Sequence, residues 1–228
     1  MTSHSFTCLI PAYNEAARIG AVLDVVVGHA LLDAVIVIDD GSTDDTHAIA
    51  QSKGAQVIRT AGNLGKTKAL ALGLQKVQTS HIVLIDADLT GLTAAALSAL
   101  IDPVLQGNAS ATISLRGNAP RTWRLIGIDY ISGERVIPQA LLADQQDRLG
   151  GLPRFGFEVF LNRLLIARNA PIAIVKWPDV ASPSKASKRG AVAGIRADIA
   201  MMADIFRTIG PVDCLRQITA LRRLRHAS

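Results

Sequence analysis

The sequence predicts an α/β domain built on a mostly parallel sheet, and three observations support this fold class. With 228 residues, 49% of them hydrophobic, the chain is long enough to bury one large core. Over the first 115 residues, short apolar runs alternate with amphipathic stretches, as in crossovers onto a sheet that helices cover on both faces. Polar residues follow each of the first four apolar runs. An open sheet of this kind binds its ligand outside the carboxyl ends of its strands, so function is expected there.

The individual elements follow from periodicity and from helix start signals. Strands are expected where short runs of aliphatic and β-branched residues occur, at 7–10, 34–38, 56–60, 81–85, 109–115 and 172–176. Helices are expected in the amphipathic stretches between them, at 14–27, 43–53, 66–77 and 93–105. Ser42, with Asp45 three residues later, resembles a capping box, and Thr93 precedes an alanine-rich run. These two signals place the starts of the second and fourth helices.

The last 39 residues form a predicted helical segment, 190–228, with a basic amphipathic character. Apolar residues recur at spacings of three and four, and then of three, at Val192, Ile195, Ile199, Met202, Phe206, Ile209, Leu215, Ile218, Leu221 and Leu224. Arginines accompany the end of this stripe, at 216, 222, 223 and 225. Two interpretations stay open. The stripe packs on its own domain or on a second copy of the chain, giving a homodimer, or it lies on an anionic membrane surface.

Composition excludes several classes of protein. Two cysteines provide neither a disulfide framework nor zinc-site spacing, which suits a reducing compartment. The N-terminus lacks a signal-peptide pattern, and no apolar run reaches the roughly 18 residues of a spanning helix, so we expect a cytoplasmic protein, at most peripheral on the inner face of the membrane. Residues 1–110 hold 6 basic and 10 acidic residues, and residues 111–228 hold 18 and 9. The basic half therefore favours an anionic partner, but 4% aromatic content disfavours nucleic acid.

Two carboxylates, Asp86 and Asp88, follow the apolar run 82–85 directly. A spacing of two along an extended backbone points both side chains to the same side. Carboxylates in this arrangement suit a hard divalent cation, Mg²⁺ or Mn²⁺, which leaves coordination positions for the oxygens of a diphosphate. The alternative is that one aspartate caps the next helix while the other is solvated.

Three earlier loops extend this pattern. They are Pro11-Ala12-Tyr13-Asn14-Glu15 after the first strand, Asp39-Asp40-Gly41-Ser42 after the second and Asn63-Leu64-Gly65-Lys66 after the third. In this order, and together with Asp86-x-Asp88, these motifs resemble those of family 2 glycosyltransferases, which have the GT-A fold. The resemblance implies an enzyme that transfers a sugar from a nucleotide sugar. It implies a nucleotide-binding half at 1–115 and an acceptor half at 116–189.

The resemblance also implies roles in donor binding. Four residues of the opening loop would line the base and ribose: Pro11, Ala12, Tyr13 and Glu15. Asp40 would hydrogen-bond the base edge, as a carboxylate can with an N–H of uracil or guanine, Gly41 would permit the turn, and Lys66 would reach the diphosphate. Simpler roles stay open: a packed ring for Tyr13, solvation for Lys66, and a cap on the following turn for Asp39.

The same resemblance assigns the metal pair. Asp88 would be the principal ligand, with Asp86 nearer the ribose or bound through water. The cation would stabilise negative charge on the departing nucleoside diphosphate. In some relatives a late histidine completes the metal shell, and this chain has none at 176–190.

Two segments of the second half resemble acceptor-side motifs of the family. In Ser132-Gly133-Glu134-Arg135, Ser132 and Gly133 would face the donor sugar, while Arg135 would start a helix and contact phosphate. In Gly156-Phe157-Glu158, Glu158 would lie near the reacting carbon, either as general base for a hydroxyl acceptor or as an orienting group for a phosphate acceptor. A glutamate favoured by the dipole in the first turn of a helix is the alternative.

The basic segment 182–189, with Lys185, resembles a Gly-Ser-Lys segment of polyprenyl-phosphate sugar transferases. It therefore favours a phosphate-bearing acceptor, either a polyprenyl phosphate or a small phosphorylated metabolite. The alternative is an ordinary solvated connector, and inversion or retention at the anomeric carbon stays open. Two other functions stay open: a catalytically silent nucleotide-sugar binder, and a sugar nucleotidyltransferase. The second is disfavoured because 11–15 lacks the glycine-rich loop that such enzymes carry after the first strand.

Overall fold

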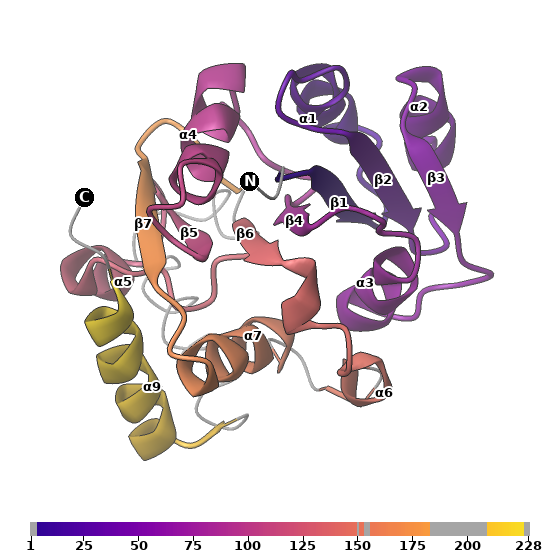
Figure 1. The fold of residues 1–228 in the computed structure, drawn as a ribbon. Coiled ribbons are helices and arrows are strands. Elements are labelled where there is room, and N and C mark those ends of the chain that lie inside the picture. The colour runs from indigo at the N-terminus through magenta and orange to yellow at the C-terminus, as the bar shows by residue number, and fades with distance from the viewer. Residues whose placement is uncertain (1–3, 150, 153–155, 183–208, 226–228) are drawn as a thin grey trace.

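A central sheet organises the molecule, and the predicted α/β class is confirmed (Figure 1). The computed structural model describes residues 4–149, 151–152, 156–182 and 209–225. Within them, seven strands pair in the order β3-β2-β1-β4-β6-β5-β7, and β6 alone runs antiparallel to its neighbours. The strands are β1 (Phe6–Ala12), β2 (Ala34–Asp39), β3 (Gln56–Arg59), β4 (His81–Leu84), β5 (Ala111–Arg116), β6 (Arg135–Pro138) and β7 (Ile172–Trp177).

Helices cover both faces of the sheet, with α1, α2 and α4 on one side and α3, α6 and α7 on the other (Figure 1). Neighbouring residues of β1 enter different cores, because successive side chains of a strand point to opposite faces: Cys8 and Ile10 join one core, and Leu9 joins the other. The helices are α1 (Ile19–Val26), α2 (Thr46–Ser52), α3 (Lys66–Leu74), α4 (Ala94–Leu105), α5 (Arg121–Ile126), α6 (Gln146–Leu149), α7 (Gly156–Ala167) and α9 (Pro211–Leu224), with a 3-10 turn η1 (Gln139–Leu141).

The strand register brings the predicted functional loops to one edge. Strand β1 lies between β2 and β4 and pairs in parallel with both, so that Ala12 is opposite Asp39 and Leu9 is opposite Leu84. The backbone N–H of Asp40 donates to the carbonyl of Ala12 at 2.8 Å, which extends the pairing by one residue. The chain therefore leaves all three strands at the same edge, as the parallel-sheet pattern predicts.

The first helix begins later than the predicted range 14–27. Asn14 has a φ of 55°, in the left-handed region that a continuous right-handed helix excludes. The residues after it form turns, and α1 starts only at Ile19. The polar opening loop therefore stays outside the helix and is available to the strand edge.

The predicted capping box at Ser42 is wrong, whereas the cap at Thr93 is confirmed. Helix α2 starts at Thr46, and the hydroxyl of Ser42 accepts instead from the backbone N–H of Asn14 at 2.9 Å. Asp45 occupies the N-cap position of α2 without a side-chain hydrogen bond. Thr93 precedes α4, and its hydroxyl accepts from the N–H of Ala96 at 3.1 Å.

Strand β6 was not predicted, and the helix expected to start at Arg135 is wrong. Arg135 is instead the first residue of β6, which pairs antiparallel with both β4 and β5. Val136 and Ile137 suit a buried strand because branched side chains pack well on a pleated surface. Pro138 ends this four-residue segment, and a proline within such a run argues against a strand when the sequence is read alone.

The tail helix α9 packs on the domain. Cys214, Ile218 and Leu221 are buried in the core that also receives α7, and the Tyr130 hydroxyl donates to Gln217 Oε1 at 2.8 Å. The predicted stripe is wrong at Leu215, which is 63% exposed, because the buried face follows 3.6 residues per turn rather than strict threes. The earlier part of that stripe, 192–206, lies outside the described residues. Within the described residues, no helix has the length and apolar content that a bilayer crossing requires.

The Thr93 cap gives a stability prediction. Replacing Thr93 with Ala removes the acceptor for the Ala96 N–H and should lower the free energy of unfolding by about 0.5–2 kcal/mol. Urea titration followed by circular dichroism measures the change. Thr122→Ala, in the exposed surface of α5, is the matched control and should change stability by less than about 0.5 kcal/mol. Equal effects of the two substitutions would contradict the capping role.

Candidate active site

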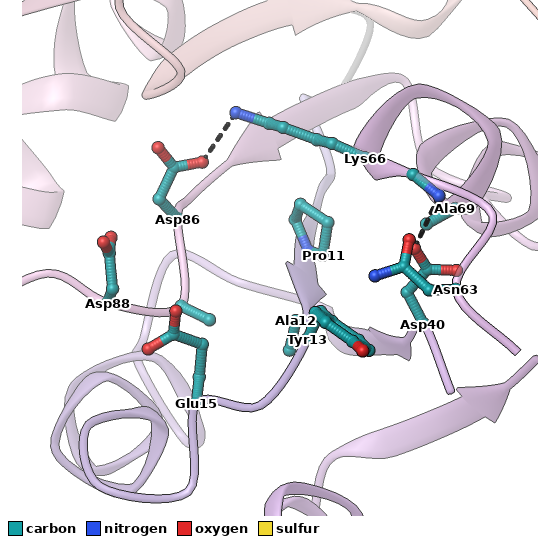
Figure 2. A pocket seen from close by; sticks show the side chains of 12 residues that line it. Pro11, Ala12, Tyr13, Glu15, Asp40, Asn63, Lys66, Ala69, Asp86 and Asp88 are labelled. Atoms are coloured by element: carbon teal, nitrogen blue, oxygen red, sulfur yellow. Dashed lines mark hydrogen bonds and ion pairs between the residues drawn. The ribbon is translucent and has the colours of Figure 1, made fainter. Parts of the chain in front are cut away.

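A cleft of about 490 Å³ lies at the carboxyl ends of β1, β2 and β4, next to the start of α3. This volume is in the range of small-molecule sites. The structure brings eight predicted site residues together in its lining: Pro11, Ala12, Tyr13, Glu15, Asp40, Lys66, Asp86 and Asp88. Asn63, Gly65, Ala69 and Ala87 also line it but were not predicted as site residues, although the first two belong to a motif that was recognised. Figure 2 shows Asp86, Asp88 and Glu15 on one wall and Asp40 and Asn63 on the other.

The opening loop is held by the loop that follows β2. The side-chain oxygen of Asn14 accepts from the backbone N–H of Thr43 at 2.8 Å, and the N–H of Glu15 donates to Thr46 Oγ1 at 2.8 Å. These bonds stabilise the left-handed turn at Asn14. Tyr13, one residue earlier, leaves its ring 43% exposed at the cleft, so the alternative of a packed ring does not apply.

Asp39 and Asp40 are both buried and have structural partners. Asp39 Oδ1 accepts from the Ser42 N–H at 2.9 Å, as the turn-capping alternative predicts, and Oδ2 lies 3.3 Å from Arg59 Nε. Asp40 lines the cleft, but its two oxygens accept from the backbone N–H groups of Leu64 (2.9 Å) and Gly65 (2.7 Å). The carboxylate predicted to bind the base edge therefore also fixes the loop before α3.

Gly41 is required both by its backbone and by its surroundings. Its φ is 73°, and a Cβ placed there would lie 2.6 Å from two backbone atoms of Gly62. The loops after β2 and β3 approach each other closely at this point. The predicted need for glycine in the turn is confirmed.

The two aspartates of the predicted metal pair both line the cleft, in different electrostatic surroundings. Burial raises the pKa of the Asp88 carboxyl, and repulsion from Asp86 raises it further. Burial also raises the pKa of Glu15, with a smaller contribution from Asp88. Figure 2 shows the carboxylates of Glu15 and Asp88 near each other. This corner disfavours further negative charge, and its hard oxygen donors fit a divalent cation. Within the part of the chain that the structure describes, no group of three or more His, Cys, Asp or Glu residues forms a preformed metal site.

Lys66 joins the two halves of the site. Its Nζ lies 2.8 Å from Asp86 Oδ1 and 3.1 Å from Glu158 Oε1, so the ammonium is paired rather than simply solvated. Burial opposes the charged form of Lys66, but attraction to Asp86 and Glu158 outweighs it and raises the lysine pKa. For Asp86, burial raises the pKa, but the charge and hydrogen bond of Lys66, together with the charge of Arg116, lower it overall. Glu158 lies in the first turn of α7, where its side chain is 8% exposed.

The predicted sugar-facing turn and phosphate contact need correction. Gly133 does face the site, but the Ser132 hydroxyl is buried and bonds to Ser114 Oγ at 2.7 Å and Glu134 Oε2 at 2.9 Å. Arg135 is completely buried, and its guanidinium donates to Asn162 Oδ1 and to two carbonyl oxygens. The structure therefore brings neither side chain to the cleft, and the proposed phosphate contact of Arg135 is wrong. Lys185 lies outside the described residues.

Comparison with known proteins places the chain in a family. Residues 7–159 match the family model described as glycosyl transferase family 2. The chain belongs to glycosyl transferase family 2. The match includes all four recognised motifs of the first half, and it ends just after Glu158.

Curated relatives share this family region. The 4,4'-diaponeurosporenoate glycosyltransferase of Staphylococcus aureus (strain MRSA252) is 38% identical over 109 residues, which cover 45% of this chain and 29% of that protein. The chain thus spans less than a third of the length of that relative. The protein of the same name from strain USA300 matches with the same identity and coverage.

Solved structures of another enzyme have the same fold as this chain. Glucosyl-3-phosphoglycerate synthase from Mycobacterium tuberculosis, in complex with phosphoglyceric acid, superposes with a TM-score of 0.67 at 23% identity, over 88% of this chain and 79% of that chain. The complex of the same enzyme with Mn²⁺, UDP-glucose and phosphoglyceric acid gives 0.66 at 24%, over 85% and 79%. At this level of identity the likeness confirms the predicted GT-A fold and nothing further.

Gly41 gives a prediction that separates the cost of a left-handed backbone from the cost of a steric clash with Gly62. Gly28 has a similar φ of 77° but has nothing within 4 Å of the added Cβ, so Gly28→Ala should cost only the left-handed conformation, about 1–2 kcal/mol. Gly41→Ala should cost a further 1–3 kcal/mol, roughly the range for overpacking, because backbone must move. Urea unfolding of both variants measures the difference, and equal losses would show that the approach to Gly62 is not tight.

Proposed function

We propose that this family 2 domain transfers a sugar from a nucleoside diphosphate sugar, held with Mg²⁺ or Mn²⁺, to a phosphate-bearing acceptor. The observation that carries the proposal is the acidic corner of Asp86, Asp88 and Glu15, at the strand ends beside a cleft of nucleotide size. The solved complexes with Mn²⁺, UDP-glucose and phosphoglyceric acid support it, since their fold is the same.

The residues of the cleft divide the work of binding. Tyr13, with its exposed ring, and Pro11 would hold the nucleoside against the loop fixed by Asp40. Asp88 would hold the cation, with Asp86 next to it, and the cation would stabilise charge on the departing diphosphate. Lys66 would place a further positive charge at this end of the cleft.

Glu158 is proposed to orient the acceptor rather than to remove a proton from it. One of its oxygens lies 3.1 Å from the Lys66 ammonium, so part of the carboxylate is already engaged with a cation. An acceptor that reacts through an ionised phosphate oxygen needs no general base. A polyprenyl phosphate has only its phosphate oxygens with which to react. A small phosphorylated metabolite that also carries a hydroxyl would need a base if it reacted through that hydroxyl.

Helix α9 has an exposed side that we propose as a contact surface. The exposed side of α9 carries Val212 and Leu215 together with Arg216, Arg222 and Arg223. This side could meet an anionic membrane surface that holds a lipid-linked acceptor, or a second copy of the chain. The division into a domain at 1–189 and a segment at 190–228 also stays a prediction, since its boundary lies outside the described residues.

Metal-dependent donor binding gives a direct test. UDP-glucose or GDP-mannose, added with MnCl₂ at about a hundred times its Kd, should stabilise the folded chain by roughly 2.7 kcal/mol. Asp88→Asn should remove this stabilisation, because the cation loses its principal carboxylate. Thermal unfolding with and without EDTA measures the effect. Asp213→Asn, an exposed carboxylate of α9, is the matched control and should bind as the wild type does.

Two outcomes of this experiment would end parts of the proposal. Stabilisation that persists in EDTA and in Asp88→Asn would refute the metal clamp. Binding that is lost in Asp88→Asn, with no turnover of any sugar nucleotide by the wild type, would favour the silent nucleotide-sugar binder.

Glu158→Gln tests the acceptor chemistry. If Glu158 only orients a phosphate acceptor, kcat should fall by less than about tenfold, whereas loss of a general base costs about 10²–10⁴. UDP release is measured with undecaprenyl phosphate and with 3-phosphoglyceric acid as acceptors, across pH. A loss of several hundredfold, together with loss of the acid limb of the pH profile, would make Glu158 a base and overturn the orienting role.

A further inference from the structure

Behind the cleft lies a buried charged cluster that the proposed donor site does not use. Arg116, at the end of β5, lies with Nη2 3.3 Å from Asp129 Oδ2 and Nη1 3.3 Å from Glu134 Oε1. Both carboxylates are completely buried, and the arginine side chain is 13% exposed. Ser114 and Ser132 donate to the other oxygen of Glu134, each at 2.9 Å.

Such a cluster is poorly explained by stability alone. Removing charges from water costs several kcal/mol per ion, which the ion pairs offset only when the geometry and the surrounding hydrogen bonds are good. Replacing buried ion clusters with well-packed apolar residues of the same volume often leaves a protein as stable or makes it more so. The cluster does fix the positions of its members, because the planar guanidinium donates in set directions and can hold two carboxylates in place.

The cluster fixes the position of Gly133. Its neighbours Ser132 and Glu134 are both held in the cluster, and the N–H of Glu134 donates to Ser132 Oγ at 3.3 Å. A Cβ on Gly133 would lie 2.7 Å from Asp86 Oδ2 and 2.9 Å from Lys66 Nζ. The turn is therefore a wall directly against the Asp86–Lys66 ion pair, and a shift of the cluster would move that wall.

The cluster also fixes the position of the segment that follows β7. The same Nη1 of Arg116 donates to the Ser182 hydroxyl, and Asn118 Nδ2 donates to the Ser182 carbonyl at 2.6 Å. One residue earlier, Ala181 exchanges two backbone hydrogen bonds with Thr90, at 2.8 and 3.0 Å. The strand-end loop that carries Asp88 and the segment up to Ser182 are thus held side by side.

We propose that Arg116 is a positioning residue that couples the two sides of the site. Through Glu134 it sets the Ser132-Gly133 wall against Asp86 and Lys66, and through Ser182 it sets the segment after β7 relative to the same carboxylates. The geometry of the donor site then depends on the contact of Arg116 with Glu134. The geometry of the acceptor side depends on the hydrogen bond from Arg116 to Ser182. The inference rests on the proposed function for its affinity and activity measurements, and the hydrogen-exchange measurement is independent of it.

Two variants separate the two connections. Arg116→Lys keeps the charge but cannot hold both carboxylates and Ser182, so affinity for UDP with Mn²⁺ should fall about tenfold, which is about 1.4 kcal/mol. Ser182→Ala removes only the second connection, so that affinity should stay within about twofold while kcat falls about fivefold or more. Titration calorimetry measures the affinity, and UDP release from UDP-glucose with undecaprenyl phosphate as acceptor measures kcat. Arg121→Lys, on the exposed surface of α5, is the matched control and should change neither.

Amide hydrogen exchange tests the coupling without any ligand. The Thr90 N–H, which donates to Ala181, should exchange faster in both variants, whereas the amides of 131–134 should exchange faster in Arg116→Lys alone. If Arg116→Lys does not fold, Ser132→Ala removes one hydroxyl from Glu134 and leaves the bond between Arg116 and Ser182. Exchange at 131–134 should then be faster to a smaller extent, and exchange at Thr90 should stay unchanged.

Failure of this inference can be told from failure of the proposed function. A wild type that neither binds UDP with Mn²⁺ nor releases UDP would refute the function, while faster exchange at 131–134 in Arg116→Lys would still support positioning. A wild type that binds, with Arg116→Lys equal to it in affinity and in exchange, overturns the positioning role. A simple loss of melting temperature, with affinity and kcat unchanged in both variants, overturns it as well.

Discussion

The rest of the site depends on the two ion pairs that the ammonium of Lys66 makes. It pairs with Asp86 after β4 and with Glu158 in the first turn of α7, residues that lie far apart in the sequence. Lys66 itself is the first residue of α3, so three separate elements meet at one charge. Because the sheet edge supplies Asp86 and helix α7 supplies Glu158, this contact fixes α7 against the sheet edge. Without it, two partly buried carboxylates would face each other without a cation between them.

The two aspartates at the end of β2 serve mainly to hold the backbone of the neighbouring loops. Asp39 and Asp40 are buried, and their oxygens contact neighbouring groups. Asp39 accepts from a turn N–H and lies beside Arg59. Asp40 accepts from two N–H groups of the loop before α3. The carboxylates available to a ligand are therefore those across the cleft, Asp88 and Glu15. This division explains how one edge of a sheet can hold many acidic residues. Those at the end of β2 stabilise loops, Asp86 is paired with Lys66, and Asp88 leaves its charge to be balanced by what binds.

The sequence was sufficient for the fold and for most of the cleft lining, because both follow from a local rule. Apolar runs that end in polar residues predict parallel strands, and parallel strands open at one edge, so the four polar loops could be placed together before any coordinates. The resemblance to family 2 glycosyltransferases then singled out eight of the residues that line the cleft. Burial and long-range pairing were not predictable in the same way. Arg135 stands next to Ser132 and Gly133 in the chain, yet only Gly133 reaches the cleft, since a short antiparallel strand turns the arginine inward. The cluster of Arg116, Asp129 and Glu134 was likewise invisible, because no spacing signals that β5 and the loop before β6 meet.

The charge balance of the acidic corner explains why a divalent cation fits the cleft. Lys66 carries one positive charge and has two carboxylate partners, so it offsets only one of Asp86 and Glu158. Arg18 lies 3.1 Å from Glu15 and offsets a second carboxylate, at an exposed position where screening weakens the pair. Asp88 remains, with its pKa raised by burial and by Asp86. A diphosphate would bring further negative charge to this corner and would be repelled. A cation of charge two reverses the sign of the interaction, because it draws Asp88 and the phosphate oxygens to the same centre.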